Sequence, residues 1–363
     1  MNRNKKINDI LKDYSKQCID FDVYIIAEAQ MYTVTKSDKR IMHANESEFF
    51  SRTEIAEIAS AIFNVFGFAK VFYDEASFIE YIIHNKVHPN ECIVYNLSRN
   101  GKKQGKKSLI PAFCDLYGIR YTGSDAFVIS LLRNKLMYSN ILANYGINVP
   151  LMKAFHYNQT SKDEIISIFE DKEIIIKNNN ESASLGLMPE CKMKLTIESY
   201  EQLCKIAKKV NSRQVLIQEY IKGKEYEVLV LQHKGKFYAL SPIEIVLPQN
   251  HEFLDSNISN CYNYQFKKAT NIETEILCKT AEKASEILGI KDYARFDFRI
   301  RDGIPYLFDI AGTPYTIRHS SVAYLFETLK YNYEDVYKAI VTCMLSNYQE
   351  YEVYCKSDNI NPL

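Results

Sequence analysis

The sequence predicts an α/β protein that becomes α+β in its C-terminal part. A chain of 363 residues is too long for one ordinary hydrophobic core, so two or three domains are expected. In roughly the first 125 residues, short apolar runs alternate with helices of about a dozen residues, which is typical of βαβ units and a mostly parallel sheet. Beyond residue 221, strand-like runs follow one another, which favours antiparallel pairing.

Composition narrows the class of protein further. Hydrophobic residues make up 47% and charged residues 25%, as in a globular protein. Lys plus Arg and Asp plus Glu both number 45, so no net charge attracts the chain to nucleic acid or to a membrane. The polar first residues and the absence of an apolar run near about eighteen residues predict no signal peptide and no membrane span, and we expect a cytoplasmic protein. The nine cysteines lack CxxC spacing, which indicates reduced thiols.

The expected N-terminal domain comprises residues 1–123. Ser51 and Glu54 form a capping-box pattern that predicts the start of a helix, and Gly67 predicts its end. The other elements are recognised by their apolar runs and spacing. Strands are expected at 21–27, 69–73, 92–97 and 119–124, and helices at 51–66, at 75–85 and before residue 117. A basic loop, "RNGKKQGKK" at 99–107, follows the third strand.

The rest of the chain divides into a central subdomain at 124–212, a C-terminal subdomain at 213–345 and a tail at 346–363. One helix is expected from Asp125 to Gly146, and the tail is expected to lie loosely on the surface. The remaining elements follow from apolar runs. Strands are expected at 173–178, 214–221, 225–231, 236–240 and 243–247, and helices at 198–210 and 272–288.

The segment 294–314, "ARFDFRIRDGIPYLFDIAGTP", predicts a hairpin with its turn at Asp302 and Gly303. A three-residue loop stacks apolar side chains on one face, which favours that register over a two-residue loop. The expected pairs are Phe296 with Ile310, Phe298 with Phe308, and Ile300 with Tyr306. Asp297 then lies opposite Asp309 on the other face, where like charges are destabilising. A cation such as Mg²⁺ between them would explain the pair, and a solvated acidic face is the alternative that the hairpin alone leaves open.

Several spaced motifs resemble those of the ATP-grasp superfamily, and most closely the D-alanine–D-alanine ligases and related carboxylate–amine ligases. The motifs occur in the same order over about residues 110 to 325. They are "LYGIRYTGSDAFVISLLRNKL", "IIIKNNNESASLG", "VLIQEYIKGKEYEV", "YQFKK" and "ARFDFRI…YLFDIAGTPYTIRHS". The resemblance implies an ATP-grasp fold with an N-terminal Rossmann-like pre-ATP-grasp domain.

The resemblance assigns nucleotide-binding roles to matching positions. Lys135 and Lys177 occupy the two lysine positions that meet the phosphates, and loop 178–186, with Ser184, is expected to close over the triphosphate. Lys267 matches a lysine that approaches the γ-phosphate, and Glu225 would bind the ribose hydroxyls. The linker strand that would meet the adenine contains Gln218, Glu219, Tyr220 and Ile221.

The resemblance also implies the metal and substrate residues. Asp297 and Asp309 would hold one or two Mg²⁺ ions, and Arg295 would stabilise charge on the transferred phosphoryl group. Arg318, His319 and Ser320 follow the hairpin where relatives hold the carboxylate of the acceptor, although an exposed helix start with Ser320 as its cap is the alternative. Glu28 is a weaker candidate for the acid that binds the substrate amine.

The chain departs from the family pattern at several positions. Ala311 stands where relatives have a metal-binding asparagine, and Tyr315 stands where they have glycine. The N-terminal strand lacks the usual Gly-Gly-x-Ser turn. The basic loop 99–107 replaces an acidic one, so it is either a solvated charged loop or a sign that the substrate carries more negative charge than alanine.

The implied function is an ATP- and Mg²⁺-dependent ligase that joins a small-molecule carboxylate to an amine, amino acids being the expected substrates, through an acylphosphate. The substrate pair is expected to differ from two D-alanines. The alternative is a catalytically silent relative that binds nucleotide and acts as a regulatory or partner protein, as Ala311 suggests. Zero net charge and the absence of interleaved aromatic residues argue against nucleic-acid binding by the basic loop. The resemblance is compatible with a homodimer.

Overall fold

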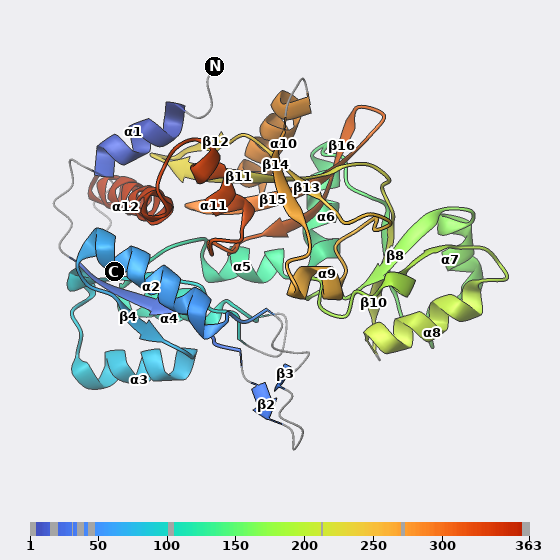
Figure 1. Cartoon of the computed structure of the whole chain (residues 1–363), viewed down its shortest axis with the longest axis horizontal. Coiled ribbons are helices and arrows are strands. Elements are labelled where there is room, and N and C mark those ends of the chain that lie inside the picture. The colour runs from blue at the N-terminus through green and yellow to red at the C-terminus, as the bar shows by residue number, and fades with distance from the viewer. Residues whose placement is uncertain are drawn as a thin grey trace.

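The computed structural model describes residues 5–14, 21–30, 32–34, 40–42, 48–100, 105–211, 213–269 and 273–357. Three sheets with their helices follow one another along the chain (Figure 1). A small hairpin of β2 (Tyr32–Val34) and β3 (Arg40–Met42) stands apart from them. No helix in these ranges is long and apolar enough to cross a membrane.

The N-terminal sheet is parallel, as predicted, with the strand order β4-β1-β5-β6. Its strands are β1 (Asp22–Ile26), β4 (Lys70–Phe72), β5 (Cys92–Asn96) and β6 (Arg120–Tyr121). The helices of this part are α1 (Lys5–Tyr14), α2 (Arg52–Phe66), α3 (Glu75–Asn85) and α4 (Leu109–Tyr117), with a 3-10 turn at Pro89–Glu91. The predicted capping box is confirmed, because Ser51 and Glu54 satisfy each other's backbone N–H at the start of α2.

The single helix predicted at 125–146 is wrong, because the chain forms two helices there. They are α5 (Ala126–Leu132) and α6 (Lys135–Asn144). Asn134 separates them: its side-chain oxygen accepts from the Met137 backbone N–H (3.1 Å) and from the Asn179 amide (2.9 Å). A side chain that caps a new helix competes with continuation of the old one. The break therefore places Lys135 in the first turn of α6.

The second sheet is antiparallel, in the order β7-β10-β8-β9, and projects to the right in Figure 1; it includes β10, which lies beyond the expected subdomain boundary at residue 212. Its strands are β7 (Met152–Phe155), β8 (Glu173–Lys177), β9 (Lys192–Lys194) and β10 (Val215–Glu219). Its helices are α7 (Lys162–Phe169) and α8 (Tyr200–Val210), with a 3-10 turn at Pro189–Cys191. The two helices and one side of the sheet bury a separate apolar core.

The C-terminal sheet is also antiparallel, in the order β14-β13-β11-β15-β16, with β12 beside β11. Its strands are β11 (Glu225–His233), β12 (Lys236–Ala239), β13 (Ile243–Val246), β14 (Gln265–Lys268), β15 (Tyr293–Arg301) and β16 (Ile304–Ala311). The helices of this part are α9 (Ser256–Asn260), α10 (Glu273–Leu288), α11 (Ser321–Thr328) and α12 (Tyr333–Ser357).

The hairpin β15–β16 combines the two registers weighed from the sequence. Next to the turn, Arg301 pairs with Ile304 and Phe298 with Leu307, which is the two-residue loop and not the expected three-residue loop. A bulge at Phe308 then shifts the register, so that Asp297 pairs with Asp309 as predicted. The expected pair of Phe298 with Phe308 is wrong, because the bulge directs Phe308 to the cleft instead of the core.

Helix α12 joins the C-terminal part to the N-terminal domain. It continues through Ser357, so the first part of the expected loose tail is helical. Ser346 is buried, and Tyr348 packs edge-on against Tyr121 of the N-terminal sheet. The largest core cluster accordingly contains residues of α1, β1, α2, β11 and α12, so the first and last parts of the chain share one core.

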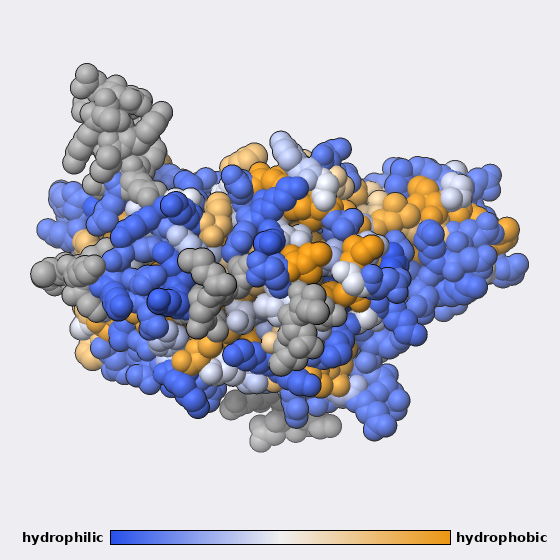
Figure 2. Space-filling view, turned by 90° about the horizontal axis from the view of Figure 1, so that it is seen from above, coloured by the Kyte–Doolittle hydropathy of each residue, from blue (hydrophilic) through white to orange (hydrophobic). Residues whose placement is uncertain are grey.

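The polarity of the surface and the state of the cysteines are those expected from the sequence. The face shown in Figure 2 is largely hydrophilic, and its hydrophobic side chains lie in small groups. Free thiols are found, as predicted, at Cys92, Cys114, Cys191, Cys204, Cys261, Cys278 and Cys343.

Gly223 is required where the linker after β10 meets the C-terminal sheet. Its φ is +149°, and a Cβ there would lie 2.1 Å from the carbonyl oxygen of Ile300. We expect Gly223→Ala to lower the free energy of unfolding by more than about 2 kcal/mol, because the clash is with backbone. Gly118 (φ +69°) has open space around it, so Gly118→Ala should cost only about 1 kcal/mol. Equal losses in urea unfolding would contradict this assignment.

Candidate active site

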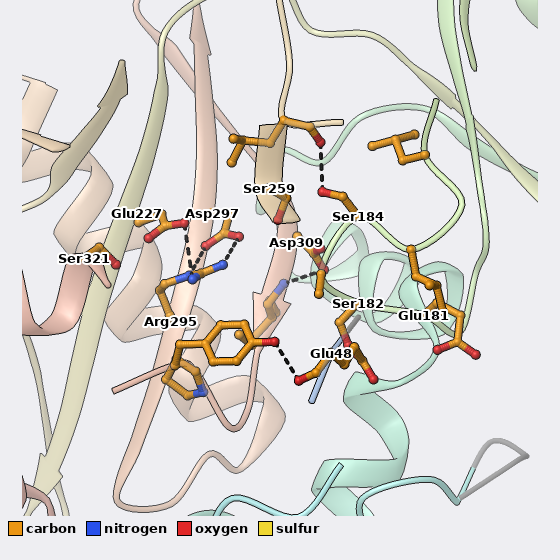
Figure 3. Close-up of a pocket in the computed structure, with 18 of the residues that line it drawn as sticks. Glu48, Glu181, Ser182, Ser184, Glu227, Ser259, Arg295, Asp297, Asp309 and Ser321 are labelled. Carbon is orange, nitrogen blue, oxygen red and sulfur yellow. Dashed lines mark hydrogen bonds and ion pairs between the residues drawn. The ribbon is translucent and has the colours of Figure 1, made fainter. Parts of the chain in front are cut away.

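A cavity of about 620 Å³ lies where the N-terminal domain, the central subdomain and the C-terminal sheet meet. Its walls include the loop after β8, the linker after β10, strands β11, β15 and β16, and the segment after β16. Figure 3 shows acidic side chains, serines and Arg295 converging on it from these elements. Thirteen of the sequence-predicted site residues line it. They are Lys135, Lys177, Ser184, Gln218, Tyr220, Ile221, Glu225, Arg295, Asp297, Asp309, Tyr315, His319 and Ser320.

Three carboxylates stand side by side on neighbouring strands of this sheet. Asp297 of β15 pairs with Asp309 of β16 on one side and with Glu227 of β11 on the other. Glu227 was missed by the sequence reasoning. The sequence could have predicted its position, because Glu225 and Glu227 are two residues apart on one strand and their side chains therefore lie on the same face of the sheet.

Arg295 lies among these acids (Figure 3). Its guanidinium donates to both oxygens of Asp297 at 2.8 Å and lies 3.2 Å from the Oε1 of Glu227. Burial raises the pKa of Asp297 to about 8; the charge of Arg295 opposes this rise, and the charges of Glu227 and Asp309 add to it.

Asp309 behaves in the opposite way. Its Oδ1 accepts from the Lys135 ammonium at 2.5 Å and from the Tyr138 hydroxyl at 3.0 Å. Burial alone would raise its pKa, but the charges of Lys135 and Lys177 lower the pKa to about 2. The pKa values of the two facing aspartates are thus shifted in opposite directions.

Lys177 lies at the end of β8, with its ammonium 5.7 Å from the centre of the Phe308 ring. Burial, together with the nearby charge of Lys135, lowers the pKa of Lys177 to about 7. An anion in the cleft would offset both effects, because an opposite charge favours the ammonium form.

The loop at 178–186 is fastened to the segment before α9. Ser184 donates to the carbonyl of Leu254 (2.8 Å), and the Ser256 N–H donates to the carbonyl of Leu187 (2.9 Å). Ala183 and Ser184 both have positive φ, so successive backbone groups turn at this point. These contacts place the loop over the cleft.

In the linker, Gln218, Tyr220 and Ile221 line the cavity, but Glu219 does not. The Glu219 carboxylate pairs with Arg301 (2.7 Å). The Glu225 carboxylate pairs with buried Arg299 (2.7 Å), which also donates to the carbonyl of Ile221 (3.2 Å). Arg299 is not among the site residues predicted from the sequence.

Besides Glu219, three predicted residues lie away from the cavity walls. Lys267 is exposed on β14, and Arg318 is exposed and pairs with Glu57 (3.8 Å). Glu28 is buried beneath the cavity, where its carboxylate accepts from the Arg99 backbone N–H (2.6 Å). Ser320 caps α11, as the alternative interpretation expected. The structure thus does not bring Glu28, Lys267 or Arg318 to the site.

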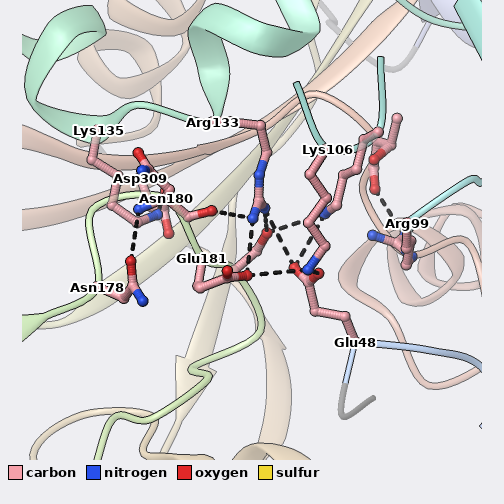
Figure 4. A network of polar contacts seen from close by, with 12 residues as sticks. Glu48, Arg99, Lys106, Arg133, Lys135, Asn178, Asn180, Glu181 and Asp309 are labelled. Carbon is pink, nitrogen blue, oxygen red and sulfur yellow. Dashed lines mark hydrogen bonds and ion pairs between the residues drawn. The ribbon is translucent and has the colours of Figure 1, made fainter. Parts of the chain in front are cut away.

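The basic loop turns inward in its described part, so the solvated-loop interpretation is wrong for that part. Residues 101–104 lie outside the described residues. Figure 4 shows Lys106 and Arg133 around Glu48 and Glu181. Lys106 lies 2.6 Å from Glu48 and 3.1 Å from Glu181, and Arg133 lies 3.0 Å from Glu181. Lys107 contacts Glu48 at 3.2 Å. This network, which we call the Glu48 cluster, joins the N-terminal domain to loop 178–186.

The family model described as "D-ala D-ala ligase C-terminus" matches residues 141–342, more than half of the chain. The chain belongs to this family. A D-alanine--D-alanine ligase from Flavobacterium johnsoniae is 26% identical over 221 residues, which are 58% of this chain and 64% of that protein. The match therefore spans less than two thirds of that relative's length.

Other relatives widen the comparison. The glutathione biosynthesis bifunctional protein GshAB of Listeria innocua is 34% identical over 114 residues, 31% of this chain and 14% of that protein. The crystal structure of D-alanine--D-alanine ligase from Bacillus anthracis has a TM-score of 0.65 and 16% identity, covering 91% of this chain and 99% of that one. A second structure of that ligase is described as complexed with ATP. The predicted α/β ATP-grasp fold is thereby confirmed.

In this member of the D-ala D-ala ligase C-terminus family, Glu48 is fully buried and its pKa is held well below the ordinary value: burial opposes this, but Lys107, Arg133 and Lys106 outweigh it. We expect Glu48→Gln to lower the free energy of unfolding in urea by about 3–5 kcal/mol, because it leaves buried cations without their acid.

Glu57→Gln is the matched control, since it removes an acid from an exposed pair with Arg318. It should change the free energy of unfolding by less than about 0.5 kcal/mol. A loss below about 1 kcal/mol in Glu48→Gln would show that the cluster does not depend on this carboxylate.

Proposed function

We propose that this chain is an ATP-dependent carboxylate–amine ligase that acts through an acylphosphate, with a substrate pair other than two D-alanines. The observation that carries the proposal is the facing pair of Asp297 and Asp309 in one cavity with Arg295, Lys135 and Lys177. Acidic oxygens opposite a set of cations suit a triphosphate and its divalent ion. A cytoplasmic location and a homodimer stay predictions from the sequence.

The residues present fit ATP and Mg²⁺. The side-chain oxygen of Gln218 is buried beside the linker and has no hydrogen-bond partner in the described part of the chain, so it can accept from the amino group of a base. No three His, Cys, Asp or Glu side chains in the described ranges form a metal cage of their own. Asp297 and Asp309 would therefore share the ion with substrate oxygens, as Mg²⁺ sites commonly do, and Ala311 adds no ligand. The ion would neutralise charge on the phosphates.

The proposed reaction has two steps. A carboxylate oxygen attacks the γ-phosphorus and the bond to ADP breaks, and Arg295 is placed to stabilise the charge on the transferred group. Lys135 and Lys177 neutralise the phosphate oxygens. The amine then attacks the acyl carbon, so that an amide forms and phosphate and a proton leave. Loop 178–186 covers the cleft and excludes water from the acylphosphate.

The direct test is a screen of amino acid pairs for ADP and phosphate release by the purified protein. Asp297→Asn should reduce turnover at least about 100-fold, because the ion and Arg295 lose their shared carboxylate. Nucleotide binding should persist, which shows that the fold is intact. Asp302→Asn, at the exposed turn of the same hairpin, should leave turnover unchanged. Nucleotide binding without turnover in the wild type, at any Mg²⁺ concentration, would support the silent relative instead.

Lys177 should make nucleotide binding depend on pH. Because its pKa is about 7 in the free cleft and an anion favours its protonated form, ADP binding above neutral pH must take up a proton. In Mg²⁺-free ADP titrations on an Asp297→Asn background, affinity should fall by up to about tenfold per pH unit between about pH 7.5 and 9.

The Asp297→Asn background removes a second residue of the cavity wall whose pKa lies in this range. Calorimetry in two buffers of different protonation enthalpy measures the proton uptake directly. Adding Lys177→Met should abolish both the uptake and most of the slope. If the slope survives that change, Lys177 is not the group responsible.

A further inference from the structure

Arg99 is a buried arginine at the N-terminal end of the cavity. Only 3% of its surface is exposed, and it lines the cavity wall. Its guanidinium lies beside two aromatic rings that meet edge to face, 4.8 Å from the centre of Phe50 and 4.3 Å from that of Tyr315. Its Nη2 donates to the carbonyl of Thr313 (2.9 Å). The contacts with the rings do not use the hydrogen-bond donors of the guanidinium.

No carboxylate in the described part of the chain forms an ion pair with this guanidinium, and its Nε is buried without an acceptor. Glu28 contacts the backbone N–H of Arg99 and not its side chain. Burial, with Glu75 nearby, raises the pKa of Glu28 to about 8, so it supplies little negative charge at neutral pH. A buried charge is ordinarily paired, so this arginine is missing an anion.

The neighbouring Glu48 cluster does not supply that anion. Three cations, Lys106, Lys107 and Arg133, share the two carboxylates of Glu48 and Glu181. Burial lowers the pKa of Lys107 well below its ordinary value; Glu48 opposes this shift, and Arg133, Arg99 and Lys106 add to it. With Arg99, this end of the cavity holds a surplus of buried positive charge.

Tyr315 connects this surplus to the proposed reaction centre. Its hydroxyl donates to the carbonyl of Glu48 (2.7 Å), and its ring covers Arg99. Arg99, Arg295 and Tyr315 line the same cavity.

We propose that Arg99 binds an anionic side chain of the substrate, in addition to the group that reacts, so that the substrate belongs to the class of acidic amino acids. This inference rests on the proposed function, because it extends the same cavity. The Nε–H of the guanidinium has no acceptor among the described residues, and the guanidinium is in contact with the rings of Phe50 and Tyr315.

The test compares isosteric probes that differ only in charge. With MgADP present, calorimetric titrations use aspartate against asparagine and glutamate against glutamine, each as the D and L forms. We expect one acidic probe to bind wild-type protein about tenfold or more tightly than its amide, because charged hydrogen bonds are lost with the charge. Arg99→Gln should remove the preference, and Arg99→Lys should keep part of it. Unchanged MgADP affinity shows that each variant is folded.

Several results would overturn the inference. They are equal binding of acid and amide by the wild type, no binding of any probe, and a preference that survives in Arg99→Gln. The proposed function fails separately, by the absence of nucleotide binding or of turnover with every pair. Turnover with neutral amino acids, without a preference for acidic ones, would contradict the role of Arg99 but would support the proposed ligase activity.

Discussion

The site depends on two aspartates that face each other across the β15–β16 ladder, each kept in place by its own cation. Asp297 is held by Arg295 and Asp309 by Lys135. The bulge at Phe308 makes this possible. Without it, the register at the turn would continue and Asp309 would lie opposite Phe296, on the apolar face of the hairpin. One extra residue in one strand therefore delivers the second carboxylate to the cavity.

The ion pairs in the cavity can exchange their partners for those of a bound nucleotide and its metal ion at little cost in free energy. A buried ion pair adds little net stability, because the desolvation of its members offsets most of their attraction. A divalent ion could therefore replace Arg295 or Lys135 as the partner of an aspartate. The released side chain would then pair with a phosphate, so that every charge stays paired. The opposite pKa shifts of the two aspartates follow from a different balance at each: burial outweighs the charge of Arg295 at Asp297, whereas the charges of Lys135 and Lys177 outweigh burial at Asp309.

Local patterns predicted most of the elements, because the spacing of apolar residues within a segment is enough to assign it. The failures were contacts between distant segments. Phe308 resembled a core residue, and only the cleft-facing bulge shows otherwise. Asn134 ends one helix and starts another partly through Asn179. The basic loop looked solvated because its acids, Glu48 and Glu181, are far away in the sequence. Glu227 could have been found from its alternation with Glu225.

Two positions at which the sequence departs from the family pattern, Tyr315 and Arg99 of the basic loop, contact each other in the structure. Tyr315 and the arginine of the basic loop stand far apart in the sequence, yet their side chains stack at 4.3 Å, and the Tyr315 hydroxyl reaches the backbone of Glu48. A site that had lost its function would have no reason to keep a buried arginine covered by rings and cations tied to a buried acid. Because burying such charges is costly unless they are used or paired, the altered end of the cavity favours a changed substrate over a silent protein.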